Sequence, residues 1–169
     1  MIIKVKIGHW RFTFTFFMAT RTRGVNSTLP DGKHILMWDF DDVPDYDVDD
    51  ALRFVQNWLR LPPIYVLWSG KGNHFIAYCF KRCTWEYAIA IIALTPHVDY
   101  NFFRFGVLRK HWTLRIDKKE GRKPKLLYVI PSKVPEDAYI DEMESFVEYE
   151  TMTDNSPRKV ISYGIPKFP

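Results

Sequence analysis

The stretch that most constrains the fold is residues 34–43, HILMWDFDDV, in which four apolar residues lead into three carboxylates. Such an apolar run predicts a buried or half-buried β-strand. Asp39 and Asp41 are two residues apart, so on a strand their side chains leave the same face. Two like charges this close repel each other, and a bound divalent cation relieves that repulsion. The alternative is a strand that simply ends in an acidic turn.

The flanking sequence predicts an α+β fold. Alternation and turn signals predict strands over residues 1–8, 10–17, 34–40, 64–69, 74–80, 97–103, 111–117 and 125–132. Apolar spacing predicts helices over 84–95 and over 47–61, the latter behind Asp caps. The apolar face of the 47–61 helix is predicted to comprise Val48, Ala51, Leu52, Val55, Trp58 and Leu59. This order predicts mixed or antiparallel sheets with helices packed on them, an RRM-like arrangement.

Charge is distributed unevenly along the chain. Residues 136–150 contain seven acids and no Lys or Arg, whereas residues 104–133 contain ten Lys or Arg and two acids. A basic surface next to a compact acidic site suits a protein that binds phosphates while holding a metal. The change in composition predicts a catalytic core over 1–134 and an acidic C-terminal extension over 135–169.

Two further features limit the class of protein. No apolar run approaches the length of a membrane span, and the N-terminus lacks a signal-peptide layout, which predicts an intracellular, cytoplasmic protein with no membrane partner. Cys79 and Cys83 are too few for a disulfide framework. No second Cys pair or paired His motif accompanies them, so they are expected to be reduced, partly buried thiols and not zinc ligands.

The second chemically marked stretch is the segment 69–74, SGKGNH, which is predicted to join two strands. Its glycines allow backbone N–H groups to approach an anion, while Ser69 and Lys71 add a hydroxyl and a cation. His74 is able to donate a hydrogen bond to a phosphate oxygen. The spacing is not that of a P-loop. An ordinary glycine-containing hairpin with an exposed lysine also explains SGKG taken alone.

Taken together, Asp39-Phe40-Asp41 and the later Ser-Gly-x-Gly-x-His hairpin resemble the archaeo-eukaryotic primase (primase-polymerase) superfamily. The first motif of that family is an acidic pair spaced by one residue, and the second is a Ser-x-His-type hairpin. Its third motif is an aspartate after a hydrophobic residue on a strand, a description that Val98-Asp99 in HVDY fits. The resemblance covers residues 34–130 and implies an RRM-like catalytic unit fused to a small α/β unit.

The resemblance implies a template-dependent nucleotidyltransferase, a DNA primase or DNA-directed polymerase, with Mg²⁺ or Mn²⁺ held by Asp39, Asp41 and Asp99. It implies nucleotide-binding roles for residues of the hairpin and of the basic segment: Ser69, Gly70, Lys71, His74, Arg115 and Lys118. The implied partners are a single-stranded DNA or RNA template, nucleoside triphosphates, and a helicase or other replication protein. The implied setting is replication of a plasmid, a virus or a thermophilic archaeon.

The third carboxylate is either Asp99 or Asp117. Asp117 lies among several bases, so an ion pair or a turn explains it. Asp99 has no Lys or Arg within four residues on either side, and an unpaired carboxylate on a strand is costly without a cation. We therefore favour Asp99.

Other functions remain open at this point. A metal-dependent nuclease or a replication initiator would use the same carboxylates for hydrolysis. A non-catalytic RRM-like nucleic-acid-binding module is a third possibility, although the chain lacks an RNP-type aromatic signature. A glycosyltransferase with an Asp-x-Asp motif would leave the SGKGNH hairpin unexplained.

Overall fold

The computed structural model describes residues 2–15, 18–70, 72–116, 121–143 and 146–153. The chain divides into two compact units, one of residues 23–147 and the other of residues 1–22 with 148–169. The fold is of the predicted α+β class, with three α-helices and antiparallel sheets among the described residues. Of the helices described, none combines the length and the apolar character needed to span a membrane.

The smaller unit begins with a hairpin. β1 (Ile2–Ile7) and β2 (Trp10–Thr15) pair antiparallel and turn at Gly8, whose φ of 58° suits glycine. They confirm the strands predicted over 1–8 and 10–17, except that residue 8 lies in the turn and residues 1, 16 and 17 lie outside the described residues. β3 (Met18–Asn26) and β9 (Phe146–Thr153) are neighbours in a second sheet. Neither was predicted, because β3 is rich in Thr and Arg and the acidic composition around β9 resembles that of a loop.

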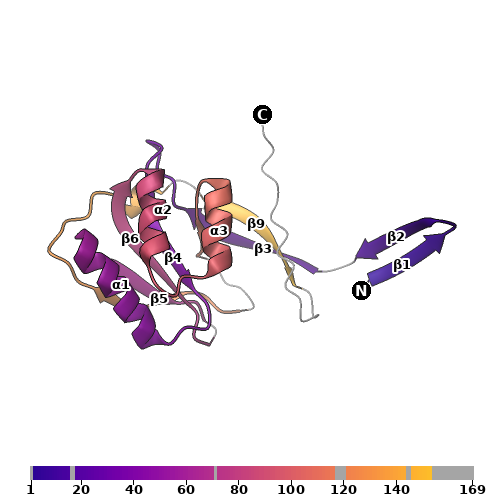
Figure 1. The fold of residues 1–169 in the computed structure, drawn as a ribbon, viewed down its shortest axis with the longest axis horizontal. Helices are drawn as coiled ribbons and strands as arrows, with labels where there is room; N and C mark the ends of the chain where they lie inside the picture. Colours follow the sequence, from indigo (N-terminus) through magenta and orange to yellow (C-terminus); the bar gives the residue numbers. More distant parts are fainter. Residues whose placement is uncertain (1, 16–17, 71, 117–120, 144–145, 154–169) are drawn as a thin grey trace. The chain divides into compact units, whose positions relative to one another are not determined.

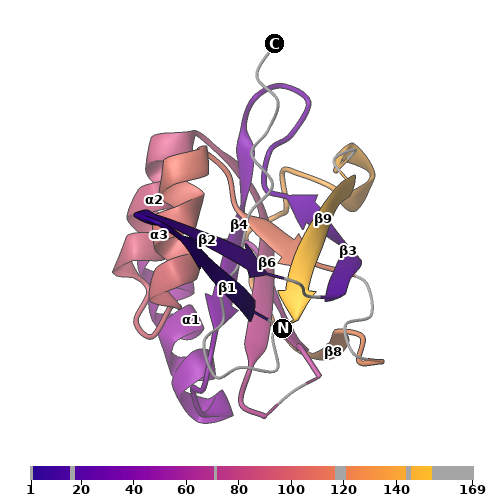
Figure 2. The same cartoon turned by 90° about the vertical axis from the view of Figure 1, so that its right-hand side faces the viewer.

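The larger unit contains a four-stranded sheet of order β4-β6-β5-β8 in which every neighbouring pair is antiparallel. Its strands are β4 (His34–Phe40), β5 (Ile64–Trp68), β6 (Phe75–Cys83) and β8 (Lys125–Ile130). α1 (Asp45–Leu59) connects β4 to β5, while α2 (Trp85–Leu94) and α3 (Tyr100–Arg109) follow β6. Figures 1 and 2 show the three helices on one face of this sheet. β7 (Thr113–Arg115) pairs instead with Gly24–Asn26 of β3.

α1 packs on the sheet largely as its sequence predicts. Val48, Ala51, Leu52 and Val55 are buried, as expected for one face of an amphipathic helix. Trp58 was predicted on this face but is 60% exposed, because it falls at the edge of the apolar stripe. The predicted Asp caps are also wrong. Pro44 is the N-cap, and the aspartates of the first turn lie near the positive end of the helix dipole without a side-chain cap hydrogen bond.

The strand predicted over 97–103 is wrong, because most of this stretch belongs to α3. Asp99 is the N-cap of α3, and its Oδ1 accepts a 2.6 Å hydrogen bond from the backbone N–H of Phe102. Phe102 and Phe103 pack against the core from the helix, so their apolar character did not indicate a strand. A capped helix therefore occupies the place where the third motif of the primase family is expected on a strand.

The first acidic residues of the predicted extension are attached to the end of β6. Lys81 Nζ lies 2.6 Å from Asp137 Oδ2, and Arg82 forms an ion pair with Glu142. Ala138 is fully buried, and its backbone N–H donates to the carbonyl of Phe80. We call these contacts of Lys81 and Arg82 the Arg82 clamp. The segment belongs to the 23–147 unit, whereas the division into functional parts at residues 134 and 135 stays a prediction.

Candidate functional site

The acidic pair lies at the end of β4. Ile35 through Trp38 are completely buried, and Phe40, between the two aspartates, is also completely buried. Asp39 is half-buried, whereas the side chain of Asp41 is 40% exposed. Burial of the strand on both faces gives the two carboxylates a rigid support, and the strand predicted over 34–40 is confirmed.

The chain turns sharply after Asp41. Asp42 has a φ of 59°, a conformation that aspartate adopts more readily than most residues. On a strand that continued past Asp41, the side chain of Asp42 would point to the opposite face. The turn redirects it, so that Asp42 Oδ1 lies 3.2 Å from Nε2 of His74. Asp42 is therefore part of the site, and the positive φ that places it there is not apparent from the sequence.

The SGKGNH segment forms the turn between β5 and β6. Ser69 N–H donates to the carbonyl of His74 at 3.0 Å, and Trp68 Nε1 donates to the carbonyl of Gly72 at 2.9 Å. Gly70 has a φ of 93°, and a Cβ at this position would lie 2.8 Å from Cβ of Arg122. Glycine is therefore required at position 70 for both conformation and space. Lys71, predicted to bind phosphate, lies outside the described residues.

His74 links the hairpin to the acidic turn. Its Nδ1 contacts Oδ1 of Asp41, its Nε2 contacts Asp42, and its side chain is only 12% exposed. The pairing of Phe40 with Phe75 in adjacent strands explains this proximity, since the two motifs flank the paired residues. We predicted a phosphate contact for His74, but in this structure its ring contacts carboxylates.

Asp99 reaches the same end of the sheet from the helix side. Its backbone N–H donates a 2.8 Å hydrogen bond to the backbone carbonyl of Asp39. Asp99 is not the unpaired strand carboxylate that the sequence predicts, because its side chain caps α3. The structure nevertheless brings Asp99 next to the acidic pair. Asp117, the competing residue, lies outside the described residues.

Arg115 lies on β7 and reaches the hairpin. Its guanidinium donates to the carbonyls of Ser69 at 2.8 Å and of Arg122 at 3.0 Å. Arg115 was predicted to lie near the nucleotide, and it does contact the predicted phosphate-binding turn. These two hydrogen bonds link the Ser69 turn to the backbone of Arg122 through the side chain of Arg115. Lys118, predicted beside it, lies outside the described residues.

The ability of this site to bind a metal ion depends on which contacts its carboxylates already make. Among the described residues, no group of three or more His, Cys, Asp or Glu side chains is arranged to hold a metal ion. Carboxylate oxygens are the ligands that Mg²⁺ and Mn²⁺ prefer, so the donor types of Asp39, Asp41 and Asp99 suit these cations. Asp41 is engaged by His74, and Asp99 is engaged by the backbone of α3. The donor chemistry fits, but the three side chains are not gathered around one point.

The two thiols do not contribute to this site. Cys79 Sγ donates to the carbonyl of Pro62, and Cys83 Sγ donates to the carbonyl of His34. Both are buried, and burial raises the pKa of Cys79 and raises that of Cys83 to about 12. Both thiols are free and are buried more completely than the partly buried state that we expected.

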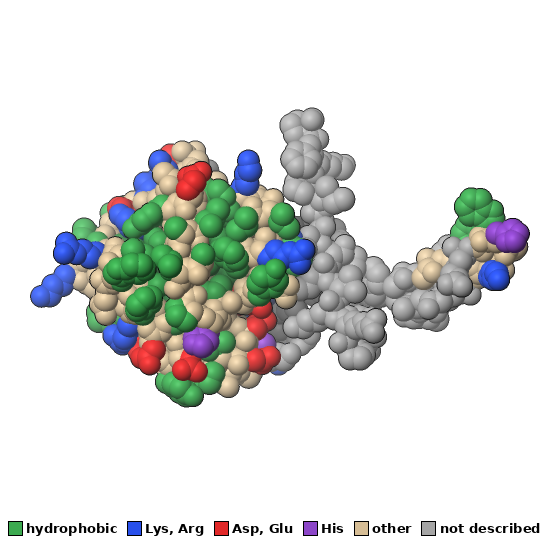
Figure 3. Space-filling model, in the orientation of Figure 1, with side chains coloured by type: hydrophobic (Ala, Val, Ile, Leu, Met, Phe, Trp, Pro, Cys, Tyr) green, Lys and Arg blue, Asp and Glu red, His purple; other side chains and the backbone are tan. Residues whose placement is uncertain are grey.

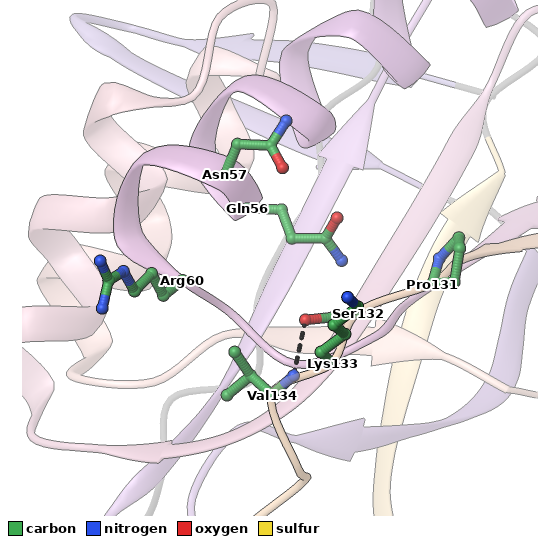
Figure 4. Close-up of a pocket in the computed structure, with 7 residues that line it drawn as sticks. All are labelled: Gln56, Asn57, Arg60, Pro131, Ser132, Lys133 and Val134. Carbon is green, nitrogen blue, oxygen red and sulfur yellow. Dashed lines mark hydrogen bonds between the residues drawn. The ribbon is translucent and has the colours of Figure 1, made fainter.

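A pocket of about 480 Å³ lies at the other end of α1 (Figure 4). It is lined by the last turn of α1 and by the segment after β8, with Arg60 and Lys133 as its charged residues. The amide of Gln56 is directed at this segment and donates to the carbonyls of Pro62 and Ile130. α1 has 15 residues, so this pocket lies about 22 Å along the helix from the acidic turn. None of the predicted site residues that the structure describes lines it.

The chain matches no protein-family model, no curated protein and no solved structure. The resemblance to the primase superfamily therefore rests on the sequence motifs alone and stays a prediction.

Proposed function

We propose that this chain is a primase-polymerase-type nucleotidyltransferase that joins nucleotides on a single-stranded nucleic-acid template. One observation carries the proposal. Three motifs that are far apart in the sequence converge at one end of the β4–β6 pair: the Asp39/Asp41 pair, the His74 hairpin and Asp99. The pairing of β4 with β6 places the acidic turn beside the hairpin, and the backbone hydrogen bond from Asp99 to Asp39 adds the third motif.

The topology of the larger unit supports an RRM-like catalytic unit. β4 and β5 are joined through α1 and flank β6, which runs antiparallel to both of them. This is a split β-α-β arrangement, and α2 after β6 extends it toward the β-α-β-β-α-β order. The departure is at the fourth strand, because β8 pairs with β5 and not with β4.

Asp39, Asp41 and Asp99 are the residues that would hold Mg²⁺ or Mn²⁺. A divalent cation bound there would supply charge stabilisation at the attacking and leaving oxygens of the transfer. For this, Asp41 must exchange its contact with His74. The imidazole then becomes available to donate to a phosphate oxygen, which gives His74 the role that its motif implies. Arg115 holds the Ser69 turn in place during this exchange.

A primer-extension assay tests the proposal. The full chain is incubated with a single-stranded template, a primer, labelled nucleoside triphosphates and Mn²⁺, and the products are resolved by size. We expect incorporation by the wild type and none by Asp39→Ala or Asp41→Ala. Asp141→Ala is the matched control, because Asp141 is an exposed carboxylate near the Arg82 clamp and should retain full activity. Cleavage of the template without extension would instead support a nuclease, and a mobility shift alone would support a binding module.

Asp99 allows a sharper test, because its role as the N-cap of α3 and its proposed role as a metal ligand are separable by substitution. Asparagine caps helices as well as aspartate does, so Asp99→Asn preserves α3 while removing the charge. We expect Asp99→Asn to lose metal-dependent incorporation with an unchanged melting temperature. Asp99→Ala should lose activity and also lower the melting temperature, because the cap is removed. Full activity in Asp99→Asn would exclude Asp99 from the site.

A further inference from the structure

α3 carries an exposed basic and aromatic face that the proposed active site does not use. The exposed side chains on it are those of Tyr100, Asn101, Arg104, Leu108 and Lys110. Tyr100 is 69% exposed and Leu108 is 68% exposed, so neither side chain packs in the core. Figure 3 shows the helix-bearing side of the molecule, where hydrophobic side chains lie with Lys and Arg around their margin. This face therefore calls for an explanation other than core packing.

The charge of this segment has a single sign. Residues 100–116 contain Arg104, Arg109, Lys110 and Arg115 and no Asp or Glu. Within the described part of the chain, neither Arg104 nor Lys110 has an ion-pair partner. A basic helix without compensating acids attracts a polyanion, and the attraction extends over about 8 Å at physiological salt.

Two of these cations are held in place by an aromatic ring. The guanidinium carbon of Arg104 lies 5.8 Å from the centroid of Phe105, and that of Arg109 lies 5.6 Å from it. Contacts between a guanidinium and a ring restrict the side chain without using its N–H donors on an acid. Arg104 is thereby oriented before a ligand binds, so its side chain loses less conformational entropy when it binds a phosphate.

The face begins next to the carboxylates. Tyr100 directly follows Asp99, whose backbone N–H is hydrogen-bonded to Asp39 at 2.8 Å. An exposed phenol ring is a surface on which a nucleic-acid base stacks without sequence preference. The 10 residues of α3 extend about 15 Å from this point, enough to contact a few nucleotides.

We propose that a single-stranded nucleic acid binds along the exposed face of α3, with a base stacked on Tyr100 and phosphates on Arg104 and Lys110. The inference rests on the proposed function, for which this face supplies the template track. A protein partner would be favoured by a continuous apolar area. Here Arg104 separates Tyr100 from Leu108, so the charge pattern favours the polyanion.

Fluorescence anisotropy of a labelled oligothymidylate tests this with the full chain, without nucleotides and with EDTA present. We expect Tyr100→Ala to raise the Kd by about 5- to 150-fold, the range for loss of one stacked base. The double variant Arg104→Gln/Lys110→Gln should reduce the slope of log Kd against log salt by about 1.4, from two lost phosphate contacts. The matched control is Arg60→Asn/Lys133→Gln, which removes the same charge from the pocket at the far end of α1 and should bind as the wild type does.

The outcomes separate this inference from the proposed function. If the wild type fails to incorporate nucleotides but the α3 variants lose binding, the proposed function is overturned and the binding face stands. If the wild type extends primers and the α3 variants bind with unchanged Kd and slope, the binding face alone is overturned. An equal loss of binding in the control pair also overturns it, since nonspecific charge would then be the cause. A change in oligomeric state on size exclusion without a change in Kd would assign the face to a protein interface.

Discussion

Gly106 in α3 is predicted to be a position where alanine destabilises the protein, although alanine normally stabilises a helix. On helix propensity alone, Gly106→Ala would raise the free energy of unfolding by about 1 kcal/mol. A Cβ on Gly106 would, however, lie 1.9 Å from Nε1, 2.1 Å from Cδ1 and 2.6 Å from Cε2 of Trp112. All three distances are far below van der Waals contact. The sign of the effect therefore depends on whether Trp112 is able to move.

The surroundings of Trp112 leave it little room. It is 1% exposed, with ring centroids 4.4 Å from Trp85 and 6.1 Å from Phe102. Overpacking a closed core costs about 1–3 kcal/mol, and a rigid indole places this site at the upper end. The net expectation is a loss of about 2 kcal/mol once the propensity gain is subtracted. For a chain of this size, the melting temperature should fall by about 4–8 °C.

Urea unfolding followed by tryptophan fluorescence measures this change. Ala90→Gly, at an exposed position within α2, calibrates the propensity alone and should cost about 1 kcal/mol. Trp112→Phe should reduce the penalty of Gly106→Ala in the double variant, because the smaller ring leaves space for the methyl group. A Gly106→Ala protein as stable as the wild type, or more stable, would refute the reasoning.

Three further predictions concern stability and access. Burial raises the pKa of both thiols, that of Cys83 to about 12, so a thiol reagent at about pH 8 should label neither cysteine until the protein is unfolded in urea; rapid labelling of the native chain would contradict this. Burial lowers the pKa of His34 from its ordinary value of 6.5, so the unfolded chain binds the proton first and the free energy of unfolding should fall as pH drops below 6.5. His34→Gln should flatten that slope in urea titrations at several pH values, and an unchanged slope would exclude His34 as the source. Arg82→Gln should speed amide hydrogen exchange across residues 136–143, measured by mass spectrometry, because it removes half of the Arg82 clamp; unchanged protection there would show that burial alone holds the segment.

The parts of the site that could be predicted from the sequence are those with local signals. The apolar run before Asp39 indicates a strand with a carboxylate at its end, and the glycines at 70 and 72 indicate a turn. The contact between His74 and Asp42 could not be predicted, since it depends on the register between β4 and β6 and on a positive φ. The predicted position of the acidic pair is therefore correct, while the partners of its side chains had to come from the structure.

α3 illustrates a different kind of error. The run YNFFRF has the aromatic content of a strand, and the pattern of apolar residues over so short a segment does not distinguish a strand from an apolar helix. A signal was nevertheless present, because Asp99 is a good N-cap residue and Arg109 and Lys110 suit the end of a helix. Trp58 and β3 were also missed because both depend on tertiary contacts. Trp58 lies at the edge of the apolar stripe of α1, where burial is decided by neighbouring elements, and β3 pairs with strands that are distant in the sequence.

The Arg82 clamp has a practical consequence for shortening the chain. Cutting at residue 134, where the composition changes, would remove Asp137 from Lys81 and Glu142 from Arg82, which would keep its ion pair with Asp31. It would also uncover the part of β6 against which Ala138 is buried. A truncation that ends after Met143, which is itself buried, would keep these contacts. It would, however, retain four of the seven acids of residues 136–150 and remove β9 from its sheet with β3. Shortening the chain at either place therefore changes the acidic charge and the fold together.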